Sequence, residues 1–366
     1  MQEISASNKV KLLIAVPSLE CGGLERNVLN ICNNINNRKF ETTLVIINNE
    51  NPFYKVTNHA VKVISLNKKN VRKAVFDLKK IVDEQKPDIV LSTANHLNLL
   101  FAIFRFVFPK KIIFIARESS IVSINTKRNK YPFLFNRLLK LCYRKFDHIV
   151  CQSKYMQQDL LTHYHIPESK TSIINNAVVL PEHWKETREC QSPRQYITVA
   201  RLSEEKGIEN ILRALQKTTT PFQYTIIGDG PLMSSLKQLT IDLKLQQQVL
   251  FAGAHSSPYS VVSEPDLFLM GSHYEGFPNV LLEANALGIP VVSFDAPGGI
   301  HEVVNPGFNG FLVPPNDLDA FAVAIDKATS FPFDTKKIQD FTLETYSTKN
   351  MMMQWEKLFQ TVFTFN

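Results

Sequence analysis

The chain has 366 residues, of which 44% are hydrophobic and 20% are charged, a composition typical of a globular protein with enough chain for two domains. No apolar run reaches the ~20 residues that a membrane-spanning helix needs, and the first residues lack the basic and apolar regions of a secretory signal. The five cysteines show neither close pairs nor metal-site spacing, which favours reduced thiols in a cytoplasmic protein.

The first half of the chain alternates strand and helix patterns. Continuous apolar segments predict strands at 10–16, 42–47, 61–66, 88–93, 111–116 and 148–152. Apolar residues at helical spacing predict helices at 24–35, 71–84 and 133–143, with one more between the fourth and fifth strands. Continuous apolar strands separated by helices are typical of a parallel sheet that helices cover on both faces.

A polar stretch at 178–194 interrupts this alternation. It contains Pro181, Trp184 and Pro193, which suits a linker between domains. The alternation then restarts, and strands are predicted at 195–200, 223–227, 249–252, 266–270, 290–294 and 310–313. Helices are predicted near 207–217, 231–243, 279–287, 299–304, 317–329 and 348–363.

We therefore expect an α/β protein with two doubly wound, Rossmann-like domains that face each other across a cleft. The predicted boundaries are 1–180 for the N-terminal domain, 181–194 for the linker, 195–345 for the C-terminal domain and 346–366 for a closing helix. In such folds ligands bind at the carboxyl ends of the strands, so the cleft is the expected site.

The net charge of +7 is distributed unevenly along the chain. Residues 1–190 hold 29 basic and 16 acidic residues, a net of +13, whereas residues 191–366 hold 12 and 18, a net of −6. Within 101–148, 11 basic and 2 acidic residues are interleaved with ten aromatic residues. This pattern suits an anionic membrane surface or nucleic acid, and a solubilising face over core aromatics is the alternative. No nucleic-acid motif accompanies the segment, so we expect a membrane surface as partner and no nucleic acid.

The most informative motif runs from Glu275 to Glu283, with seven residues between the two glutamates. It reads as a strand, a tight loop that carries Glu275, and a helix that follows Pro278 and contains Glu283, since proline is favoured in the first turn of a helix. The amides of a helix N-terminus suit a phosphate, and carboxylates accept hydrogen bonds from vicinal hydroxyls. The motif therefore predicts a site for a nucleotide diphosphate sugar, with Glu275 on the transferred sugar and Glu283 on the ribose. The alternative is a pair of glutamates favoured near a helix start by the macrodipole alone.

Glycine-containing turns and two cations are predicted to face the same cleft. Glycines before a helix let the backbone approach a phosphate, although each turn alone is also an ordinary turn. The turns contain Gly22 and Gly23, Gly228 and Gly230, and Gly298 and Gly299. Arg201 follows a strand and Lys206 precedes a helix, where two cations can neutralise a departing diphosphate. An exposed loop with surface cations is the alternative. No carboxylate pair has the spacing of a cation site, so we expect no metal.

Together these elements resemble a retaining glycosyltransferase of family 4, with the GT-B fold. The resemblance covers nearly the whole chain, and its specific part is the two-glutamate motif with Gly-Phe-Pro-Asn between them. It implies catalytic roles for Arg201, Lys206 and Glu275, and a closing helix that crosses back to the first domain. The implied donor-binding set is Gly22, Gly23, Gly228, Gly230, Phe277, Pro278, Asn279, Val280, Glu283, Gly298 and Gly299.

One position departs from the family pattern. Many relatives carry a histidine just after the strand predicted at 111–116, where this chain has Arg117 and Glu118. An acceptor-side role for these two residues is therefore inferred from their position only. His96 ends the preceding strand and is a further acceptor-side candidate, with a structural histidine as the alternative.

The expected activity is transfer of a hexose or N-acetylhexosamine from a nucleotide diphosphate sugar, with uridine as the family expectation and guanosine as the other base. The expected acceptor is a saccharide, such as a lipid-linked intermediate of surface polysaccharide or lipopolysaccharide. We expect no cofactor, and a cytoplasmic protein peripheral at the inner face of the membrane. A nucleotide-sugar epimerase or a sugar phosphorylase on the same fold is the first alternative. A non-catalytic scaffold that binds polyanions or membranes is the second.

Overall fold

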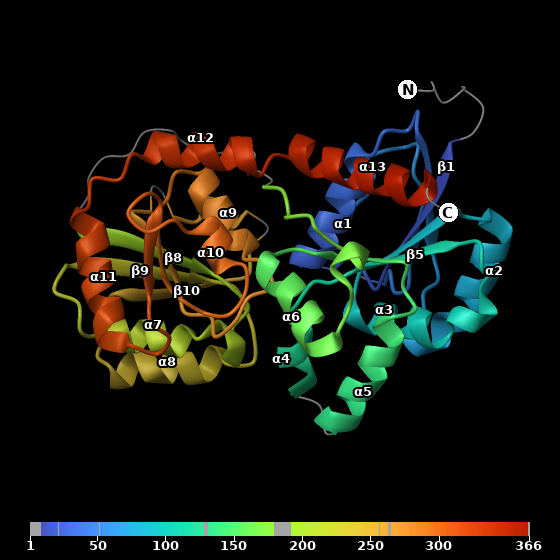
Figure 1. The fold of residues 1–366 in the computed structure, drawn as a ribbon. Helices are drawn as coiled ribbons and strands as arrows, with labels where there is room; N and C mark the ends of the chain where they lie inside the picture. The colour runs from blue at the N-terminus through green and yellow to red at the C-terminus, as the bar shows by residue number, and fades with distance from the viewer. Residues whose placement is uncertain are drawn as a thin grey trace. The chain divides into compact units, whose positions relative to one another are not determined.

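The computed structural model describes residues 9–20, 22–50, 52–127, 131–178, 192–255, 257–262 and 265–364. The chain forms two compact units, an N-terminal unit of residues 1–177 and 348–366 and a C-terminal unit of residues 178–347 (Figure 1). Most of the predicted linker, including Pro181 and Trp184, lies outside the described residues.

The N-terminal unit is built on a parallel, seven-stranded sheet with the order β3-β2-β1-β4-β5-β6-β7. The strands are β1 (Val10–Val16), β2 (Phe40–Ile46), β3 (Lys62–Ser65), β4 (Ile89–Ser92), β5 (Ile113–Arg117), β6 (His148–Cys151) and β7 (Thr171–Ile173). Side chains of the central strands are buried on both faces, which explains their continuous apolar sequences. The apolar pattern predicted every strand except the short β7.

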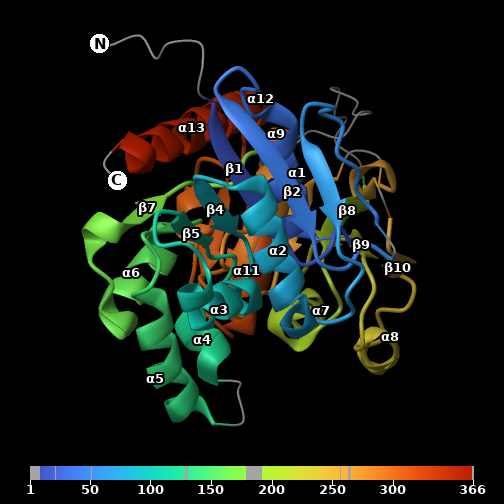
Figure 2. The ribbon, with the colours of Figure 1, turned by 90° about the vertical axis from the view of Figure 1, so that its right-hand side faces the viewer.

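The helices of this unit connect the parallel strands. They are α1 (Gly23–Asn34), α2 (Val75–Gln85), α3 (Asn95–Ile103), α4 (Val122–Lys127), α5 (Pro132–Tyr143), α6 (Lys154–Tyr164) and α13 (Thr348–Thr364). The sequence pattern did not predict α4 and α6. Helix α6 begins after Ser153, whose hydroxyl accepts a hydrogen bond from the Met156 amide. Helices α4, α5 and α6 pack against one another and lie together in both views (Figures 1 and 2).

The last helix, α13, completes the hydrophobic core of the N-terminal unit. Its buried residues follow helical spacing and are Met351, Met352, Trp355, Leu358 and Phe359. The Phe359 ring packs edge-on against Phe40 at 5.8 Å, and the Asn30 amide donates to the Thr348 hydroxyl at 3.2 Å. Helix α13 runs beside α1, as Figure 1 shows, so the two ends of the chain share one core.

The C-terminal unit has a parallel, six-stranded sheet with the order β10-β9-β8-β11-β12-β13. The strands are β8 (Arg194–Val199), β9 (Phe222–Ile227), β10 (Val249–Gly253), β11 (Leu267–Met270), β12 (Val291–Phe294) and β13 (Gly310–Val313). The helices are α7 (Ile208–Leu215), α8 (Met233–Asp242), α9 (Asn279–Ala286), α10 (Ile300–Val303), α11 (Leu318–Ser330) and α12 (Thr335–Thr345). The sequence pattern predicted all of these except α12.

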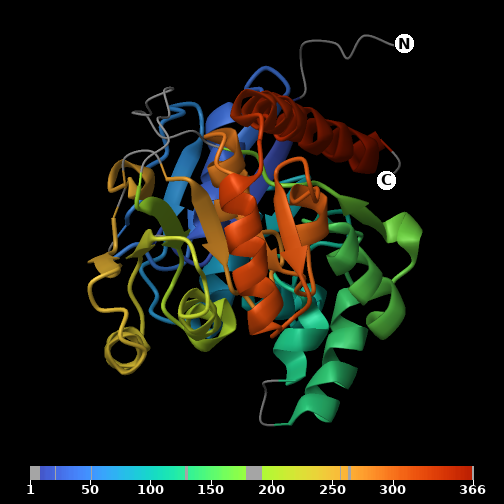
Figure 3. The same ribbon diagram turned by 90° about the vertical axis from the view of Figure 1, so that its left-hand side faces the viewer.

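Alternating side chains of β11 supply two cores, one on each face of this sheet. Leu267 and Leu269 pack with residues of α7, α8 and α11. Phe268 and Met270 pack with residues of α9 and α10 on the other face. Figure 3 shows α11, coloured orange-red, lying along the strands. Because all the strands are parallel, their carboxyl ends meet at one edge, and the loops that follow them are brought together there.

Candidate functional site

Four loops gather at the carboxyl edge of the C-terminal sheet. They follow β8, β9, β11 and β12 and contain residues 200–207, 228–232, 271–278 and 295–299. Backbone hydrogen bonds connect them: the Leu202 amide to Asp229 O, the His273 amide to Glu205 O, and the Glu275 amide to Pro297 O, each 2.9 Å. The loops thus form a continuous rim around the β8 loop.

An ion pair between Lys206 and Glu275 lies in this rim. Lys206 Nζ is 2.7 Å from Glu275 Oε1, and the Ser272 hydroxyl donates to the same oxygen at 2.7 Å. Burial disfavours the charged ammonium, but the Glu275 carboxylate outweighs it, so the pKa of Lys206 lies above its usual value. Lys206 therefore remains a cation at neutral pH, held by a partly buried carboxylate.

Two glycines that the sequence analysis did not single out let these loops touch. Gly207 has φ +55°, and a Cβ placed on it would lie 2.0 Å from the carbonyl oxygen of Gly271. A Cβ on Gly271 would lie 2.4 Å from the carbonyl oxygen of Gly207. The sequence contained a signal for both glycines, since Gly271 directly follows a predicted strand and Gly207 precedes a helix. The close approach brings the segment of Lys206 against the segment of Glu275.

The predicted glycine turns pack backbone against backbone on the same rim. Gly298 has φ +129° and forms a parallel bridge with Glu275, and a Cβ there would lie 1.5 Å from the Glu275 carbonyl oxygen. Gly228 has φ +143°, and its Cβ would lie 1.9 Å from the Ala200 carbonyl oxygen. Gly230 likewise has no room beside Leu202. These glycines fix the loops that carry the ion pair.

Arg201 lies two residues beyond the end of β8, on the same loop as Lys206. Its side chain is exposed and makes no ion pair with another described residue. The structure therefore places both predicted cations on one loop, one of them held by Glu275 and the other directed to solvent.

The remaining residues of the two-glutamate motif have different surroundings. Phe277 is buried, and its ring packs 6.0 Å from Tyr346 in the core, so its side chain supports the loop from beneath. Pro278 is the N-cap of α9, which begins at Asn279, the first residue of the predicted helix. Asn279 and Val280 are half-buried in the first turn of α9. Glu283 is buried within α9.

In the N-terminal unit, the predicted glycines lie between β1 and α1. Gly22 is the extended N-cap of α1, and Gly23 is its first, exposed residue. The Glu25 carboxylate folds over Gly22, because a Cβ placed there would meet it at 2.2 Å. Burial raises the pKa of Glu25 above its usual value. His96 is an exposed residue in the first turn of α3.

Arg117 and Glu118 are not available to an acceptor in this structure, which corrects the expectation that they line its site. They are 1% and 0% exposed, because the chain continues from β5 beneath α3 and α5. Glu118 Oε1 accepts hydrogen bonds from Tyr143 at 2.7 Å and from Asn98 at 2.5 Å, and Arg117 donates to Asn176 at 2.7 Å. Arg117 Nη1 and Glu118 Oε2 have no hydrogen-bond partner among the described residues.

Burial has the largest effect on the pKa values of Arg117 and Glu118. It raises the pKa of Glu118 to about 7, although the bonds from Tyr143 and Asn98 and the charge of Arg117 oppose the shift. It lowers the pKa of Arg117 to about 10. The polar partners Asn98, Tyr143 and Asn176 come from distant segments, so sequence reasoning could not have found this cluster.

Within the described ranges, no three His, Cys, Asp or Glu side chains are grouped so that they could hold a metal ion. None of the described helices has the length and apolar character needed to cross a lipid bilayer.

Two family models cover most of the chain. The model of glycosyl transferases group 1 matches residues 181–342, and that of Glycosyltransferase Family 4 matches residues 21–180. The chain is a family 4 glycosyltransferase. This confirms the family assignment and the expectation of an enzyme, and it does not favour the alternative of a non-catalytic scaffold.

Individual relatives agree with this assignment. The N-acetylgalactosamine-N,N'-diacetylbacillosaminyl-diphospho-undecaprenol 4-alpha-N-acetylgalactosaminyltransferase of Campylobacter jejuni is 28% identical over 315 residues, covering 83% of this glycosyltransferase and 86% of the relative. The lipopolysaccharide 1,6-galactosyltransferase of Salmonella typhimurium is 32% identical over 165 residues, covering 43% of this chain and only 46% of the relative. Both are transferases, and these similarities do not favour the epimerase or phosphorylase alternative.

The solved structures confirm the fold. The crystal structure of Anabaena Alr3699/HepE in complex with UDP and glucose matches with a TM-score of 0.78 and 18% identity, covering 96% of this chain and 100% of the other. At this identity the similarity shows the fold alone. The glycosyltransferase therefore has two Rossmann-like domains of the GT-B type, as the sequence predicted.

Proposed function

We propose that this glycosyltransferase transfers a hexose or N-acetylhexosamine from a UDP-sugar to a lipid-linked saccharide of surface polysaccharide or lipopolysaccharide synthesis, with retention of anomeric configuration. Three similarities support the proposal. The Campylobacter relative is named for an undecaprenol diphosphate-linked acceptor, and the Salmonella relative for lipopolysaccharide. The related Anabaena protein was solved with UDP and glucose.

The ion pair of Lys206 with Glu275 is the observation that carries the proposal. Lys206 supplies a fixed positive charge to the departing diphosphate, where stabilisation of developing charge is often a large catalytic contribution. Arg201, exposed on the same loop, supplies a second. Glu275 accepts hydrogen bonds from hydroxyls of the transferred sugar, while Ser272 holds the carboxylate in place.

The other predicted donor-binding residues are assigned to the diphosphate and the ribose of the nucleotide sugar. The Val280 amide, in the first turn of α9, is assigned to the diphosphate because the first N–H groups of a helix have no intrahelical partner. The Asn279 amide donates to the Phe277 carbonyl oxygen at 3.0 Å, so its predicted contact with the donor stays a prediction. Glu283, buried in the same helix, is assigned to the ribose hydroxyls. Gly298 lies beside Glu275 in a backbone bridge, and its amide is assigned to the donor, whereas the Gly299 amide donates to the Glu275 carbonyl oxygen at 3.4 Å and positions that loop. The predicted contacts of Gly22 and Gly23 with the donor stay a prediction.

We also propose that transfer requires no metal ion. Metal ions commonly neutralise diphosphates in other enzymes, and here Arg201 and Lys206 supply that charge. Transfer is therefore expected to continue at an undiminished rate in excess EDTA. A loss of transfer that added Mg²⁺ or Mn²⁺ restores would contradict this part of the proposal.

We further propose that the enzyme is peripheral at an anionic membrane, which it contacts through residues 101–148. This segment is the most basic part of the chain, and a lipid-linked acceptor places the reaction at a membrane surface.

A panel of nucleotides tests the proposal against its alternatives. UDP and UDP-sugars are expected to raise the melting temperature of the protein, and transfer of labelled sugar is expected to require the saccharide acceptor. NMR of the product then shows whether the donor's anomeric configuration is retained. Consumption of UDP-sugar without an acceptor, or dependence on inorganic phosphate, would support an epimerase or a phosphorylase instead. No stabilisation by any nucleotide would contradict the donor assignment.

A further inference from the structure

Helix α5 carries a stripe of large apolar side chains on its outer face. Phe133, Leu134 and Leu141 are each at least 61% exposed, and Leu138 is 39% exposed. Leu134, Leu138 and Leu141 recur at intervals of four and three residues, so they share one helical face. Single exposed apolar residues are normal, but a contiguous row on one helix marks an interaction site.

The structure shows which aromatic residues of 101–148 are available for the predicted contact with a membrane. Half of those residues are buried in the core and cannot contact a membrane; they are Phe101, Phe108, Phe114, Tyr143 and Phe146. Among the aromatic residues on or next to α5, Tyr131 and Phe133 are exposed. The surface that remains is therefore centred on α5.

The inner face of α5 holds the helix firmly on the N-terminal unit. Leu139, Cys142 and Tyr143 are buried, and the Tyr143 hydroxyl donates to Glu118 at the end of β5 at 2.7 Å. Helix α5 extends outward from the sheet of this unit (Figures 1 and 2). The apolar stripe is thus displayed by a helix whose other face is already occupied.

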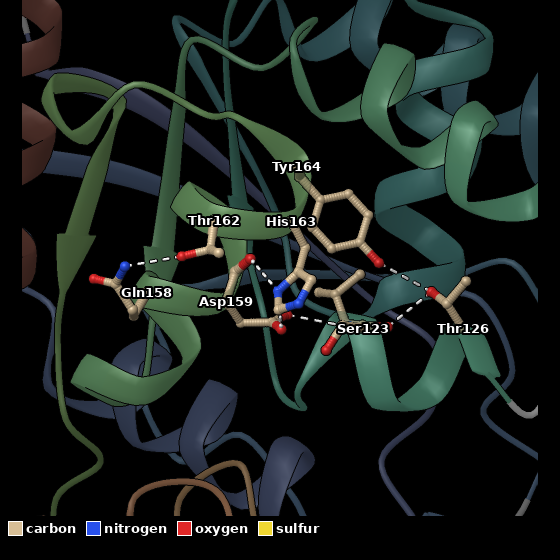
Figure 4. A network of polar contacts seen from close by, with 8 residues as sticks. Ser123, Thr126, Gln158, Asp159, Thr162, His163 and Tyr164 are labelled. Atoms are coloured by element: carbon tan, nitrogen blue, oxygen red, sulfur yellow. Dashed lines mark hydrogen bonds and ion pairs between the residues drawn. The ribbon is translucent and has the colours of Figure 1, made fainter. Parts of the chain in front are cut away.

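A hollow adjoins the N-terminal end of the stripe. It has a volume of about 210 Å³ and is lined by Ser123, Thr126, Lys127, Pro132, Phe133, Asn136 and His163. The Asp159 carboxylate links two of the lining residues: it accepts a hydrogen bond from the Ser123 amide at 3.1 Å and pairs with His163 Nδ1 at 3.1 Å (Figure 4). The hydroxyl of Thr126, another lining residue, is 3.1 Å from that of Tyr164. The hollow is therefore a fixed feature between α4, α5 and α6.

Positive charge surrounds the stripe and indicates the chemistry of its partner. Arg137, Lys140 and Arg144 belong to or directly follow α5, and the Arg137 guanidinium lies 5.5 Å from the centre of the Phe133 ring. Of the two acidic residues in 101–148, Glu118 is buried and Asp147 is bound to the Phe114 amide at 2.7 Å. Apolar side chains interleaved with cations complement an anionic lipid surface.

We propose that α5 is a membrane-docking helix that lies in the interface of an anionic bilayer. The stripe of Phe133, Leu134, Leu138 and Leu141 enters the boundary between headgroups and acyl chains. Arg137, Lys140 and Arg144 contact lipid phosphates, and the hollow receives part of one lipid against Phe133. This inference deepens the membrane contact in the proposed function, on which it rests, but its test requires no glycosyl transfer.

Cosedimentation with vesicles tests the docking helix. The wild-type protein is expected to bind phosphatidylcholine vesicles that contain 30% phosphatidylglycerol and to bind pure phosphatidylcholine weakly. Replacing two stripe residues, Leu134→Asp with Leu138→Asp, is expected to lower the partition coefficient about tenfold or more, because charge replaces buried apolar surface. The matched control, Ile241→Asp with Val323→Asp, changes two exposed apolar residues on helices of the C-terminal unit and is expected to stay within about twofold.

Equal binding by the stripe variant and the wild type, or no binding by the wild type, would overturn the proposal. So would a wild-type dimer that the stripe variant abolishes, because the stripe would then be an interface between copies of the chain. The UDP-induced rise in melting temperature is measured on the same samples. Its absence from every sample would refute the proposed donor site while leaving the docking result intact.

Discussion

The buried carboxyl of Glu118 predicts a specific dependence of stability on pH. Burial raises its pKa in the folded protein to about 7, from an ordinary value of 4.5. Between these two values the unfolded chain has lost the proton whereas the folded chain keeps it. The stabilising contribution is therefore complete below about pH 4.5 and is lost as the pH rises through about 7, at a cost of up to about 3 kcal/mol.

Replacing Glu118 with Gln removes this titration and keeps the shape of the cluster. The amide oxygen can still accept hydrogen bonds from Tyr143 and Asn98. We expect the variant to be similar to the wild type in unfolding free energy near pH 5 and more stable than it by up to about 3 kcal/mol near pH 8.

Urea unfolding at several pH values measures this difference. Trp355 is buried in the core of the N-terminal unit, and the chain has two tryptophans, so a Trp184→Phe background makes fluorescence report on that unit. Glu168→Gln, at an exposed glutamate of the same unit, is the control and should leave the pH dependence unchanged. A Glu118→Gln variant whose unfolding free energy declines with pH as steeply as the wild type would refute the reasoning.

Two further substitutions test the packing that supports the two units. Gly298→Ala places a Cβ 1.5 Å from the Glu275 carbonyl oxygen, so we expect lower stability, by about 1–3 kcal/mol, and a higher KM for the donor. Gly307→Ala has a similar backbone strain with open space around it, and it should leave the KM unchanged; equal KM values for both variants would contradict the assignment. Trp355→Ala should lower the unfolding free energy by about 3–5 kcal/mol in a urea melt, and a cost below about 1 kcal/mol would show that α13 is dispensable to the core.

Much of the fold could be predicted because its signals are local. Strands such as β1 and β12 are continuous apolar runs, and a parallel sheet buries both of their faces. Strand β7 escaped prediction because it has three residues and is only partly buried. Helix α12 escaped because few of its residues face the core, with Ile338 and Thr342 as its buried ones.

The candidate site was predictable where its chemistry is local and unpredictable where contacts cross the fold. Lys206 and Glu275 could be assigned to one site from their places after strands, but only the structure shows the bond between them. Arg117 and Glu118 were assigned to the acceptor side because they stand where many members of the family carry a histidine. The residues that bury and bind them, such as Tyr143, lie far away in the sequence, and no local pattern indicates this.

Binding and transfer measured on two variants of the same ion pair test the central claim most directly. Lys206→Met removes the charge proposed for the diphosphate, and we expect UDP affinity to fall about 10- to 150-fold, the value of a hydrogen bond to a charged group. Glu275→Gln keeps a hydrogen-bond acceptor for Lys206 but loses the carboxylate proposed for the sugar. We expect it to bind UDP within about threefold of the wild type while kcat/KM for transfer falls about 10- to 150-fold.

The control is Lys217→Met, which breaks an exposed ion pair with Asp319 in the same unit and should change neither UDP affinity nor transfer. The account predicts that calorimetric titration of UDP separates the two variants of the Lys206–Glu275 pair and that both transfer sugar slowly. Unchanged UDP affinity in Lys206→Met, or wild-type transfer by Glu275→Gln, would contradict it.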